Sequence, residues 1–375
     1  MSRFYLCFLI LLITASVQGQ RIRVNENETA LGKFPNVVQV EFQKIISYLH
    51  SEPREMHLKN GFIICHNTRT PEDGYWIIIL TKNGELVDKK FKRGRGPNEV
   101  LQAGSSGLIN NKFWIFDRGL GRIWFTNDFL EKESDLTSNT VDLKVLQVRY
   151  VDDASVITFG STGTNNKYDI YDFNANMILR GLGNLNTLSR LIDVNTSANE
   201  EWSPQPEKLF FEGDYKVKPD RTKFVAGCYW FDVIEIYNIT GELIKAIRGP
   251  LNLNPNFKIF RNNDYAGVDR PPHTRIGYTY ISCSDKYIYA GFSGKRIMEN
   301  SPFHFEKIYV FNWEGESIAI LNLNHSIRSF VVDEEEKSIY AVSGQSGDLI
   351  KASFIIEDAP EAAIGCSGGS FCWGC

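Results

Sequence analysis

Long apolar runs, basic clusters and catalytic motifs are all scarce in this chain of 375 residues. Beyond the first twenty residues, no stretch approaches the ~18 consecutive apolar residues of a membrane-spanning helix, which excludes a transmembrane segment. Lys and Arg number 41 against 45 Asp and Glu, and they form no block that resembles a phosphate-binding track. Nucleic acid is therefore excluded as a partner.

Two hydrolase signatures are also missing. The chain has neither the Gly-x-Ser-x-Gly elbow of serine hydrolases nor the His-Glu-x-x-His helix of zinc proteases. Histidines such as His66, His304 and His325 are scattered and lack the spacing of metal ligands. We expect no metal and no cofactor, although carboxylates from distant segments could still converge for acid–base chemistry on a glycan.

Amphipathic helices are nearly absent as well, and this excludes an alternating βαβ fold. A short helix is expected at residues 41–49. Hydrophobic residues make up 43% and aromatic residues 13% of the chain, a composition that suits half-buried strands.

The start of the chain has the features of a secretory signal peptide. Arg3 supplies a positive charge, residues 4–13 form an apolar run, and residues 15–19 end in small side chains suited to cleavage before Gln20. Residues 1–19 are therefore predicted to be removed on export to the periplasm or the cell exterior. Loss of Arg3 changes the formal net charge from −4 to −5.

What the chain does contain is a repeated unit of two short strands joined by a turn rich in Gly, Asn or Asp. The turns fall at Asn83-Gly84, Asn127-Asp128, Asn174-Ala175, Thr240-Gly241, Glu314-Gly315 and, more weakly, Ser346-Gly347. Successive turns are about 45, 46, 66, 74 and 32 residues apart, and a four-stranded propeller blade repeats at ~40–50 residues. We therefore predict an all-β fold, a six-bladed β-propeller with four-stranded antiparallel blades, over residues 35–356.

The predicted blades have unequal lengths, because the third and fourth steps carry insertions. They cover residues 60–92, 104–137, 144–182, 205–249, 276–324 and 326–356. The last blade is one strand short, and the strand Val37–Phe42 is expected to complete it and so join the two ends of the ring. Residues 20–34 are expected to form a flexible arm, and residues 357–375 a flexible Cys-rich tail.

Several segments resemble a known family. Residues 93–100 are similar to the Gly-Arg-Gly-Pro-Gly-Glu-Phe signature that follows the first blade in exported six-bladed propellers of bacteria, with Asn98 where the signature has glycine. Residues 286–294, 307–315 and 331–340 are similar to the C-terminal half of the TolB-like six-bladed β-propeller family. The resemblance covers most of residues 35–356 and implies the propeller fold, and it brings no catalytic residues.

Arg93 and Arg95 are the first candidates for ligand binding. They lie on a loop hinged by two glycines, where two guanidiniums could clamp a carboxylate, sulfate or phosphate. The alternative is that one of them pairs with Glu99 or a neighbouring carboxylate and locks the loop.

Two further turns offer candidates. Asp117 and Arg118 lie between aromatic strands and could share a pocket on one face, or Asp117 could form a surface ion pair with Arg118 or Arg122, which contributes ~0–1 kcal/mol. His273 and Arg275 follow a long polar insertion and two prolines that restrict their geometry. The alternative for this last pair is a solvated loop.

The cysteines fall into two groups after Cys7 is removed with the signal peptide. Cys65, Cys228 and Cys283 stand alone in strand-like runs and are predicted to be buried free thiols. The tail contains three more cysteines, Cys366, Cys372 and Cys375. A local or intermolecular disulfide, a processing or attachment signal, and metal or redox chemistry all stay open for them, and the odd thiol suggests a disulfide-linked partner.

The function predicted from the sequence is binding by an exported ring. Rim loops would present Arg, His and aromatic side chains to a peptide, glycan or protein ligand. Tryptophans would suit contacts with sugar or peptide, but most of Trp76, Trp114, Trp124 and Trp313 are expected in the core between blades. The alternative is an extracytoplasmic hydrolase or lyase that acts on glycan or peptide through rim carboxylates or a histidine.

Overall fold

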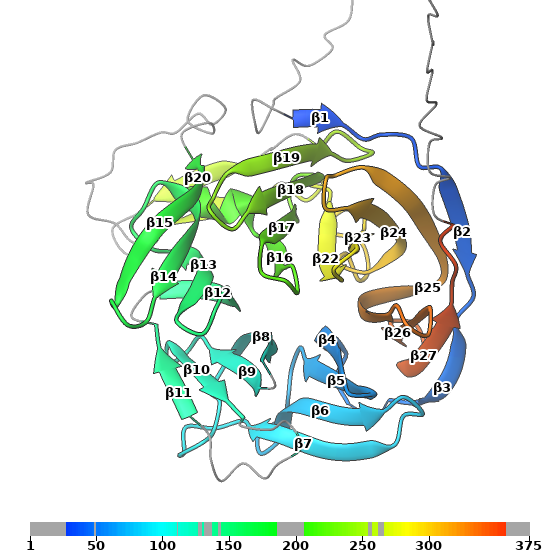
Figure 1. Ribbon diagram of the computed structural model, residues 1–375, viewed down its shortest axis with the longest axis horizontal. Helices are drawn as coiled ribbons and strands as arrows, with labels where there is room; N and C mark the ends of the chain where they lie inside the picture. The colour runs from blue at the N-terminus through cyan, green and yellow to red at the C-terminus, as the bar shows by residue number, and fades with distance from the viewer. Residues whose placement is uncertain are drawn as a thin grey trace, which may run out of the picture.

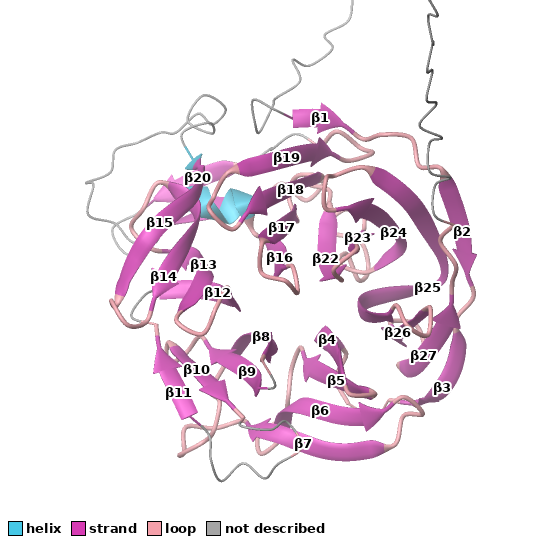
Figure 2. Ribbon diagram, viewed as in Figure 1, coloured by secondary structure: helices cyan, strands magenta, loops and turns pink. Residues whose placement is uncertain are grey.

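The computed structural model describes residues 28–48, 50–110, 112–126, 130, 137–141, 144–185, 206–253, 257–261 and 266–357. Over these residues the chain is an all-β propeller, with its sheets standing around a common axis (Figures 1 and 2). The predicted signal peptide, the turn at Asn127-Asp128 and the three cysteines of the tail lie outside the described residues.

Three antiparallel four-stranded sheets follow one another along the chain, and in each the first strand lies nearest the axis (Figure 1). The first sheet contains β4 (Pro53–Lys59), β5 (Phe62–Asn67), β6 (Tyr75–Thr81) and β7 (Leu86–Lys92). The second contains β8 (Ala103–Ile109), β9 (Lys112–Asp117), β10 (Arg122–Phe125) and β11 (Thr137–Thr140). The third contains β12 (Lys144–Tyr150), β13 (Ser155–Ser161), β14 (Asn166–Asp172) and β15 (Met177–Asn184).

The rest of the ring has two larger sheets. One contains β16 (Gly213–Val217), β17 (Lys223–Cys228), β18 (Val233–Asn238) and β19 (Leu243–Arg248), with β1 (Glu28–Ala30) on its outer edge. The other runs through β22 (Tyr278–Cys283), β23 (Tyr287–Phe292), β24 (Phe305–Asn312), β25 (Ser317–Asp333), β26 (Ser338–Ser343), β27 (Asp348–Ser353) and β3 (Gln43–Ser47). Beside β25 lies β2 (Asn36–Val40).

Two smaller elements decorate the ring. The 3-10 helix η3 (Pro206–Phe211) precedes β16. The strands β20 (Lys258–Arg261) and β21 (Ala266–Asp269) form a two-stranded sheet in the insertion that follows β19.

The burial of the strands explains why their sequences are runs of aromatic and β-branched residues. Middle strands such as β5, β17 and β23 are buried along almost their whole length, whereas the outermost β15 is mostly exposed. A strand between two radially packed sheets buries both faces, so a continuous apolar run is stable there. The hydrophobic clusters accordingly lie between neighbouring parts of the ring, and the four tryptophans named above are buried, as expected.

The strand β25 serves two parts of the ring. Its first half pairs with β24, as in Ile308↔Leu321, and its second half pairs with β26, as in Phe330↔Ala341. The register shifts on both sides of the segment between these halves. One long strand therefore takes part in the hydrogen-bond ladders of both β24 and β26.

The turn predictions agree with the structure where the residues are described. Gly84, Gly241, Gly315 and Gly347 connect neighbouring antiparallel strands with φ values of 86°, 101°, 76° and 69°. Asn98 has a φ of 63°, a left-handed conformation that glycine adopts freely and asparagine tolerates. This conformation explains how asparagine can replace the glycine of the resembling signature.

The prediction that the strand Val37–Phe42 completes the last blade is wrong. Residues 36–40 form β2, which pairs in parallel with β25 on the outside of the ring, whereas β3 pairs antiparallel with β27 at the edge of the eight-stranded sheet. The expected helix at 41–49 is replaced by β3, because a segment beside an open sheet edge gains ladder hydrogen bonds there.

The prediction of a flexible arm at residues 20–34 is also wrong for the part of it that the structure describes. The strand β1 pairs in parallel with β19, and Glu28 forms a buried ion pair with Arg248, with Oε1 2.9 Å from Nε. This pair anchors the arm to the ring.

The predicted start of the first blade at residue 60 is wrong as well. It omits β4, whose residues Pro-Arg-Glu-Met-His-Leu-Lys mix polar and apolar side chains. The omission matters because β4 is the innermost strand of its sheet.

Candidate functional site

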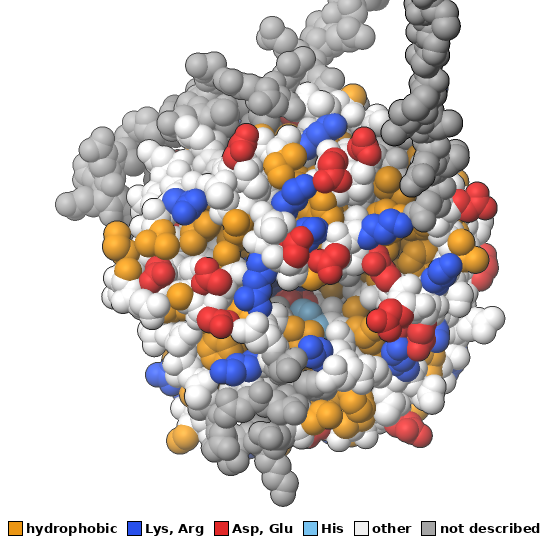
Figure 3. Space-filling view, in the orientation of Figure 1, with side chains coloured by type: hydrophobic (Ala, Val, Ile, Leu, Met, Phe, Trp, Pro, Cys, Tyr) orange, Lys and Arg blue, Asp and Glu red, His pale blue; other side chains and the backbone are white. Residues whose placement is uncertain are grey.

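The innermost strands surround the axis and run in one direction. Residues near their beginnings, such as Glu55, Gln147 and Asp214, line one cavity, and residues near their ends, such as Tyr150 and Val217, line another. The two cavities therefore lie at opposite ends of an axial channel. Figure 3 shows one face of the ring, hollowed near its centre, with a histidine visible in the hollow.

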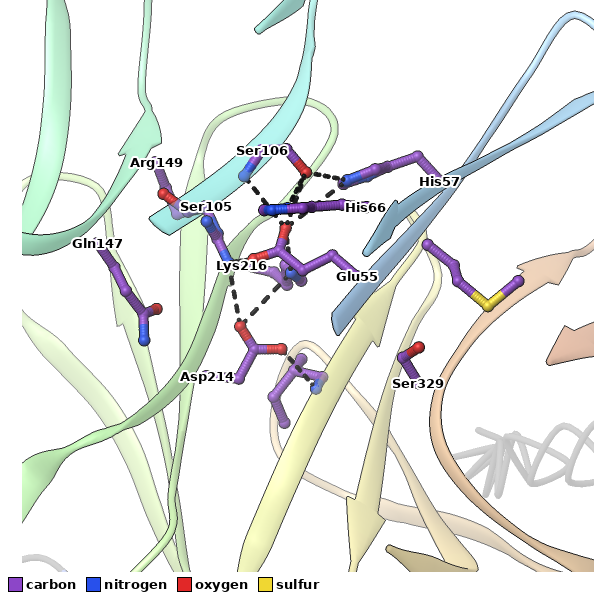
Figure 4. A network of polar contacts seen from close by, with 12 residues as sticks. Glu55, His57, His66, Ser105, Ser106, Gln147, Arg149, Asp214, Lys216 and Ser329 are labelled. Atoms are coloured by element: carbon purple, nitrogen blue, oxygen red, sulfur yellow. Dashed lines mark hydrogen bonds and ion pairs between the residues drawn. The ribbon is translucent and has the colours of Figure 1, made fainter. Parts of the chain in front are cut away.

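A buried network, which we call the channel plug, lies between the cavities (Figure 4). It consists of Glu55, His57, His66, Ser106, Arg149, Asp214 and Lys216. Arg149 is at its centre: its Nη2 lies 2.7 Å from Glu55 Oε1 and 3.1 Å from Asp214 Oδ1. The Nε and Nη1 atoms of Arg149 donate to backbone carbonyls at 2.9 and 3.0 Å, so this guanidinium is fully used within the protein.

The charges of the plug compensate one another. Burial would raise the pKa of Glu55, but the positive charges of Arg149 and Lys216 outweigh it and hold the pKa well below its ordinary value. Burial would lower the pKa of Arg149, and Glu55 and Asp214 raise it instead. Two carboxylates thus face two cations, and a buried cluster of this kind is stable because every charge has a partner.

The histidines of the plug are neutral. Burial lowers the pKa of His57 and of His66 to about 3. Both rings contact the hydroxyl of Ser106, with His57 Nε2 and His66 Nδ1 each 3.0 Å from Oγ. Glu55 Oε2 lies 3.6 Å from the same Nε2 atom of His57. This is not a catalytic triad, in which the carboxylate contacts the ring nitrogen opposite the serine.

The plug connects separate sheets. Glu55 comes from β4, Ser106 from β8, Arg149 from β12 and Asp214 from β16, and Asp214 Oδ2 also accepts from the backbone N–H of Ile281 in β22 at 2.9 Å. Strands that share no backbone ladder are therefore joined at the axis by side chains.

The cavity at the beginnings of the strands is rich in arginine, and we call it the arginine mouth. It has a volume of about 240 Å³. Arg54 from β4, Arg118 after β9 and Arg328 from β25 line it. Its other lining residues are Glu55, Gln147, Glu212, Asp214, Tyr229, Thr279, Tyr280 and Phe303.

The three arginines have little compensation from the protein. Arg54 and Arg118 make no side-chain hydrogen bond or ion pair with the described residues, and Arg328 Nη1 lies 4.0 Å from Glu52 Oε2. Burial lowers the pKa of Arg118, and repulsion by Arg54 lowers it further against the opposing effect of Glu212. Burial also lowers the pKa of Arg328, as do Arg54 and Arg69, and Glu52 opposes them.

The carboxylates near the mouth are already bound elsewhere. Glu212 Oε2 accepts from the indole N–H of Trp230 at 3.2 Å and lies 3.3 Å from Arg270 Nη2. Glu52 Oε1 lies 3.0 Å from His304 Nε2. The mouth therefore has an excess of positive charge, and guanidiniums are suited to recognise carboxylate, sulfate or phosphate.

Aromatic and hydroxyl groups complete the mouth. The rings of Tyr229 and Phe303 make an edge contact with centroids 5.5 Å apart. The buried hydroxyl of Thr279 has no hydrogen-bond partner among the described residues. A ligand in the mouth would find an apolar wall beside the guanidiniums and an unused hydroxyl.

Among the six candidate binding residues, all of which are described, Arg118 lines the mouth and the other five line neither channel cavity. Arg93 donates from Nη1 to the carbonyl of Thr70 at 2.7 Å, and Arg95 is exposed. Arg275 donates to the carbonyl of Gly294 at 2.6 Å, and His273 is exposed.

Neither of the two ion pairs considered from the sequence, one with Glu99 and one with Asp117, forms among the described residues. Glu99 accepts a hydrogen bond from the backbone N–H of Gly96 at 2.7 Å, and neither Arg93 nor Arg95 pairs with it. The other pair was expected at the surface, but Asp117 is fully buried. Its carboxylate accepts from the backbone N–H groups of Leu101 at 2.7 Å and Gln102 at 3.1 Å, and so holds the loop between β7 and β8.

Arg54 and Arg328 were not among the residues predicted from the sequence. Arg54 lies near the start of β4, and Arg328 lies near the start of the half of β25 that pairs with β26, so neither is in a loop. The sequence signal for these residues is an arginine near the start of the axis-lining part of two strands. It can be recognised only after each strand has been assigned its place in the sheet.

Three of the cysteines lie in the described part of the chain. Cys65 and Cys228 are buried free thiols, as predicted, and Cys283 is free but partly exposed. No group of three or more His, Cys, Asp or Glu side chains in the described ranges could hold a metal ion. In those ranges, too, no helix is long and apolar enough to cross a membrane.

Comparisons with known proteins agree with the fold. A solved structure from Bacteroides fragilis, described as a candidate exported protein, is similar with a TM-score of 0.51 at 10% identity, over 88% of this chain and 99% of that one. A member of family DUF4221 from Bacteroides vulgatus has a TM-score of 0.48 at 11% identity, over 85% of this chain and 96% of that one. At such low identity the likeness of the first shows the fold alone.

Sequence comparison is more specific. No curated protein matches the chain. The model of a family described as TolB-like 6-blade propeller-like matches residues 32–335. With so much of its length matched, the chain belongs to the TolB-like 6-blade propeller-like family.

Proposed function

We propose that this protein is an exported binding protein built as six four-stranded antiparallel blades, with an anionic ligand held in the arginine mouth. The division of β25 supports the blade count: if its two halves belong to different blades, the eight-stranded sheet becomes two blades. The strand β3 is then the outermost strand of the last blade.

The observation that carries the proposal is the convergence of Arg54, Arg118 and Arg328 without matching carboxylates. Like charges that approach one another destabilise a protein, and a ligand anion relieves this repulsion. Each guanidinium presents a planar pair of donors, so the chemistry selects a carboxylate, sulfate or phosphate group. A peptide, a glycan or a protein can carry such a group.

Binding suits the mouth better than catalysis does. No histidine lines it among the described residues, and Glu55 at its base is held ionised by Arg149. Acid–base hydrolysis needs a group that can donate a proton to the leaving atom. The lining instead offers permanent cations, aromatic rings and a hydroxyl.

Export is part of the proposal. The signal-peptide features of residues 1–19 and the resemblance to exported bacterial propellers support a location in the periplasm or outside the cell. The Bacteroides fragilis structure carries a description that points the same way.

The test is calorimetric titration of mature protein with matched probes. The panel contains an oligogalacturonate, a sulfated oligosaccharide, an acidic peptide, and a neutral analogue of each. We expect an anionic probe to bind and its neutral analogue to bind far more weakly. Arg118→Ala should weaken that binding about tenfold to a hundredfold, because a hydrogen bond to a charged group contributes about 1.5–3 kcal/mol.

The matched control is Arg95→Ala. Arg95 is also an exposed arginine of the described chain but does not line the mouth. Its loss should leave the affinity unchanged. Equal weakening by both variants, or equal affinity for charged and neutral probes, would contradict binding in the mouth.

A further inference from the structure

The opposite end of the channel holds a larger cavity, which we call the lysine hollow. Its volume is about 560 Å³, and cavities of ~300–1,000 Å³ are typical of small-molecule sites. Lys59, Lys216, Lys218 and Arg221 line it, and its described lining contains no Asp or Glu. A chain of formal net charge −4 thus has a cavity lined by cations.

Lys216 lies where the hollow meets the channel plug. Its side chain is 13% exposed, and its Nζ atom is itself buried, 3.4 Å from Asp214 Oδ1 and 3.6 Å from Glu55 Oε2. The Nζ atom makes no hydrogen bond among the described residues, although it lies 5.4 Å from the centroid of the Tyr280 ring. An anionic oxygen in the hollow can accept hydrogen bonds that the protein leaves unmade.

The other cations of the hollow differ in whether their side chains have partners within the protein. Lys218 pairs with Asp220, and Arg221 donates to Asn110 Oδ1 at 2.8 Å. Lys59 makes no side-chain hydrogen bond or ion pair with any described residue. Lys59 therefore supplies the uncompensated charge, and Lys216 supplies N–H groups that make no hydrogen bond among the described residues.

The walls of the hollow are largely apolar. Leu58, Leu108, Val217 and Val332 line it, come from four different innermost strands and are each only partly buried. Each packs on one side against a hydrophobic cluster of the ring. Their remaining surface borders the cavity, where an apolar ligand body could cover it.

We propose that the lysine hollow binds a small monocarboxylate with an apolar body, such as an aryl-alkyl acid. The carboxylate accepts hydrogen bonds from Lys216 Nζ, and Lys59 adds long-range attraction. The apolar body lies against the partly buried leucine and valine side chains. Charge complementarity selects the acid over the alcohol of the same shape, because the lining has cations and no carboxylate. The site is distinct from the arginine mouth because the channel plug lies between them.

The experiment is calorimetric titration of mature protein with 4-phenylbutyrate and with 4-phenylbutan-1-ol. We expect the acid to bind at least about tenfold tighter than the alcohol, since a charge-assisted hydrogen bond is worth about that factor. Lys216→Met and Lys59→Glu should each weaken binding of the acid, Lys216→Met by about tenfold. Lys89→Glu makes the same charge change on the outermost strand β7 and should have no effect.

The outcomes separate this proposal from the previous one. Lys59→Glu carries the test if Lys216→Met does not fold, since the Lys59 side chain makes no hydrogen bond or ion pair with the described residues that the fold could lose. Absence of binding, equal binding of acid and alcohol, or acid binding that survives both substitutions overturns the proposal. Acid binding that Arg118→Ala abolishes also overturns it, because the acid then occupies the mouth; binding unaffected by Arg118→Ala supports it.

Discussion

The channel plug and the arginine mouth contain the same kinds of side chain and use them differently. In the plug, Arg149 lies within 3.1 Å of two carboxylates and donates its remaining N–H groups to the backbone. In the mouth, Arg54 from β4 and Arg118 after β9 have no such partners, and the nearby glutamates pair with other groups. Arginine paired with carboxylate stabilises the ring, whereas unpaired arginine leaves positive charge for a ligand.

The largest expected effect comes from breaking the plug. Glu55→Gln should lower the free energy of unfolding by about 3–5 kcal/mol, because it leaves two buried cations, Arg149 and Lys216, with only one carboxylate, that of Asp214. Urea unfolding at pH 7 measures this change. In the control Glu314→Gln, which removes an exposed ion pair with Lys223 of 3.0 Å, the loss should stay below about 1 kcal/mol. Similar losses in both variants would remove the distinction between the plug and the surface.

The next effect is the pH dependence of the plug. His57 and His66 have pKa values of about 3 in the folded protein, against about 6.5 when unfolded, so below pH 6.5 the unfolded state takes up protons that the folded state does not. Stability should therefore fall by about 1.4 kcal/mol per pH unit for each histidine as the pH drops from 6.5 towards 3. Glu55, whose pKa is depressed, adds a loss in the same direction below about pH 4.5.

Urea unfolding at pH 7.5, 6.5 and 5.5 tests this slope. His57→Gln should reduce the slope below pH 6.5 by the share of one histidine, and His273→Gln, at an exposed position, should not change it. An unchanged slope in His57→Gln would show that the ring takes up its proton in the folded state.

A smaller effect of opposite sign is expected at the mouth. Arg54→Gln should raise the free energy of unfolding by about 0–1 kcal/mol in ligand-free protein, because it relieves repulsion that lowers the pKa of both Arg118 and Arg328. Thermal unfolding at low ionic strength measures it, and added salt should reduce the difference. A destabilised Arg54→Gln would mean that this arginine supports the fold as those of the plug do.

The smallest effect belongs to Arg95, the exposed arginine of the signature-like loop. Arg95→Ala should change stability by less than about 0.5 kcal/mol, as surface substitutions usually do. The same unfolding measurement checks this, and a clear loss would reveal a contact that holds the loop.

Part of the fold could be predicted from the sequence, because most strands of a propeller pair with strands that are neighbours in the sequence. Hairpin turns with Gly at positive φ and fully buried middle strands leave a pattern in neighbouring residues. The closing strand was not readable, since residues 36–40 and 43–47 both form strands and both lie at sheet edges. Which edge each one takes depends on parts of the chain about three hundred residues away.

The residues of the candidate sites could hardly be predicted from the sequence, for a related reason. The strand β4 contributes Arg54, Glu55 and His57 to the axis, and its mixed polarity does not resemble a buried strand. Its polar side chains are stable there only because Arg149 and Asp214 meet them from other sheets. Arg118 was found because it lies in a turn with glycines, where sequence signals are strong.

The sequence by itself determined the all-β repeat, the turns and the free thiols, since each depends on residues close together in the chain. The tertiary structure decided which charges are compensated. Arg149 is matched and Arg54 is not because ring closure brings Glu55 and Asp214 to the first and leaves the second facing Arg118 and Arg328. Electrostatic compensation depends on distances in space, and these exist only after the ring has closed.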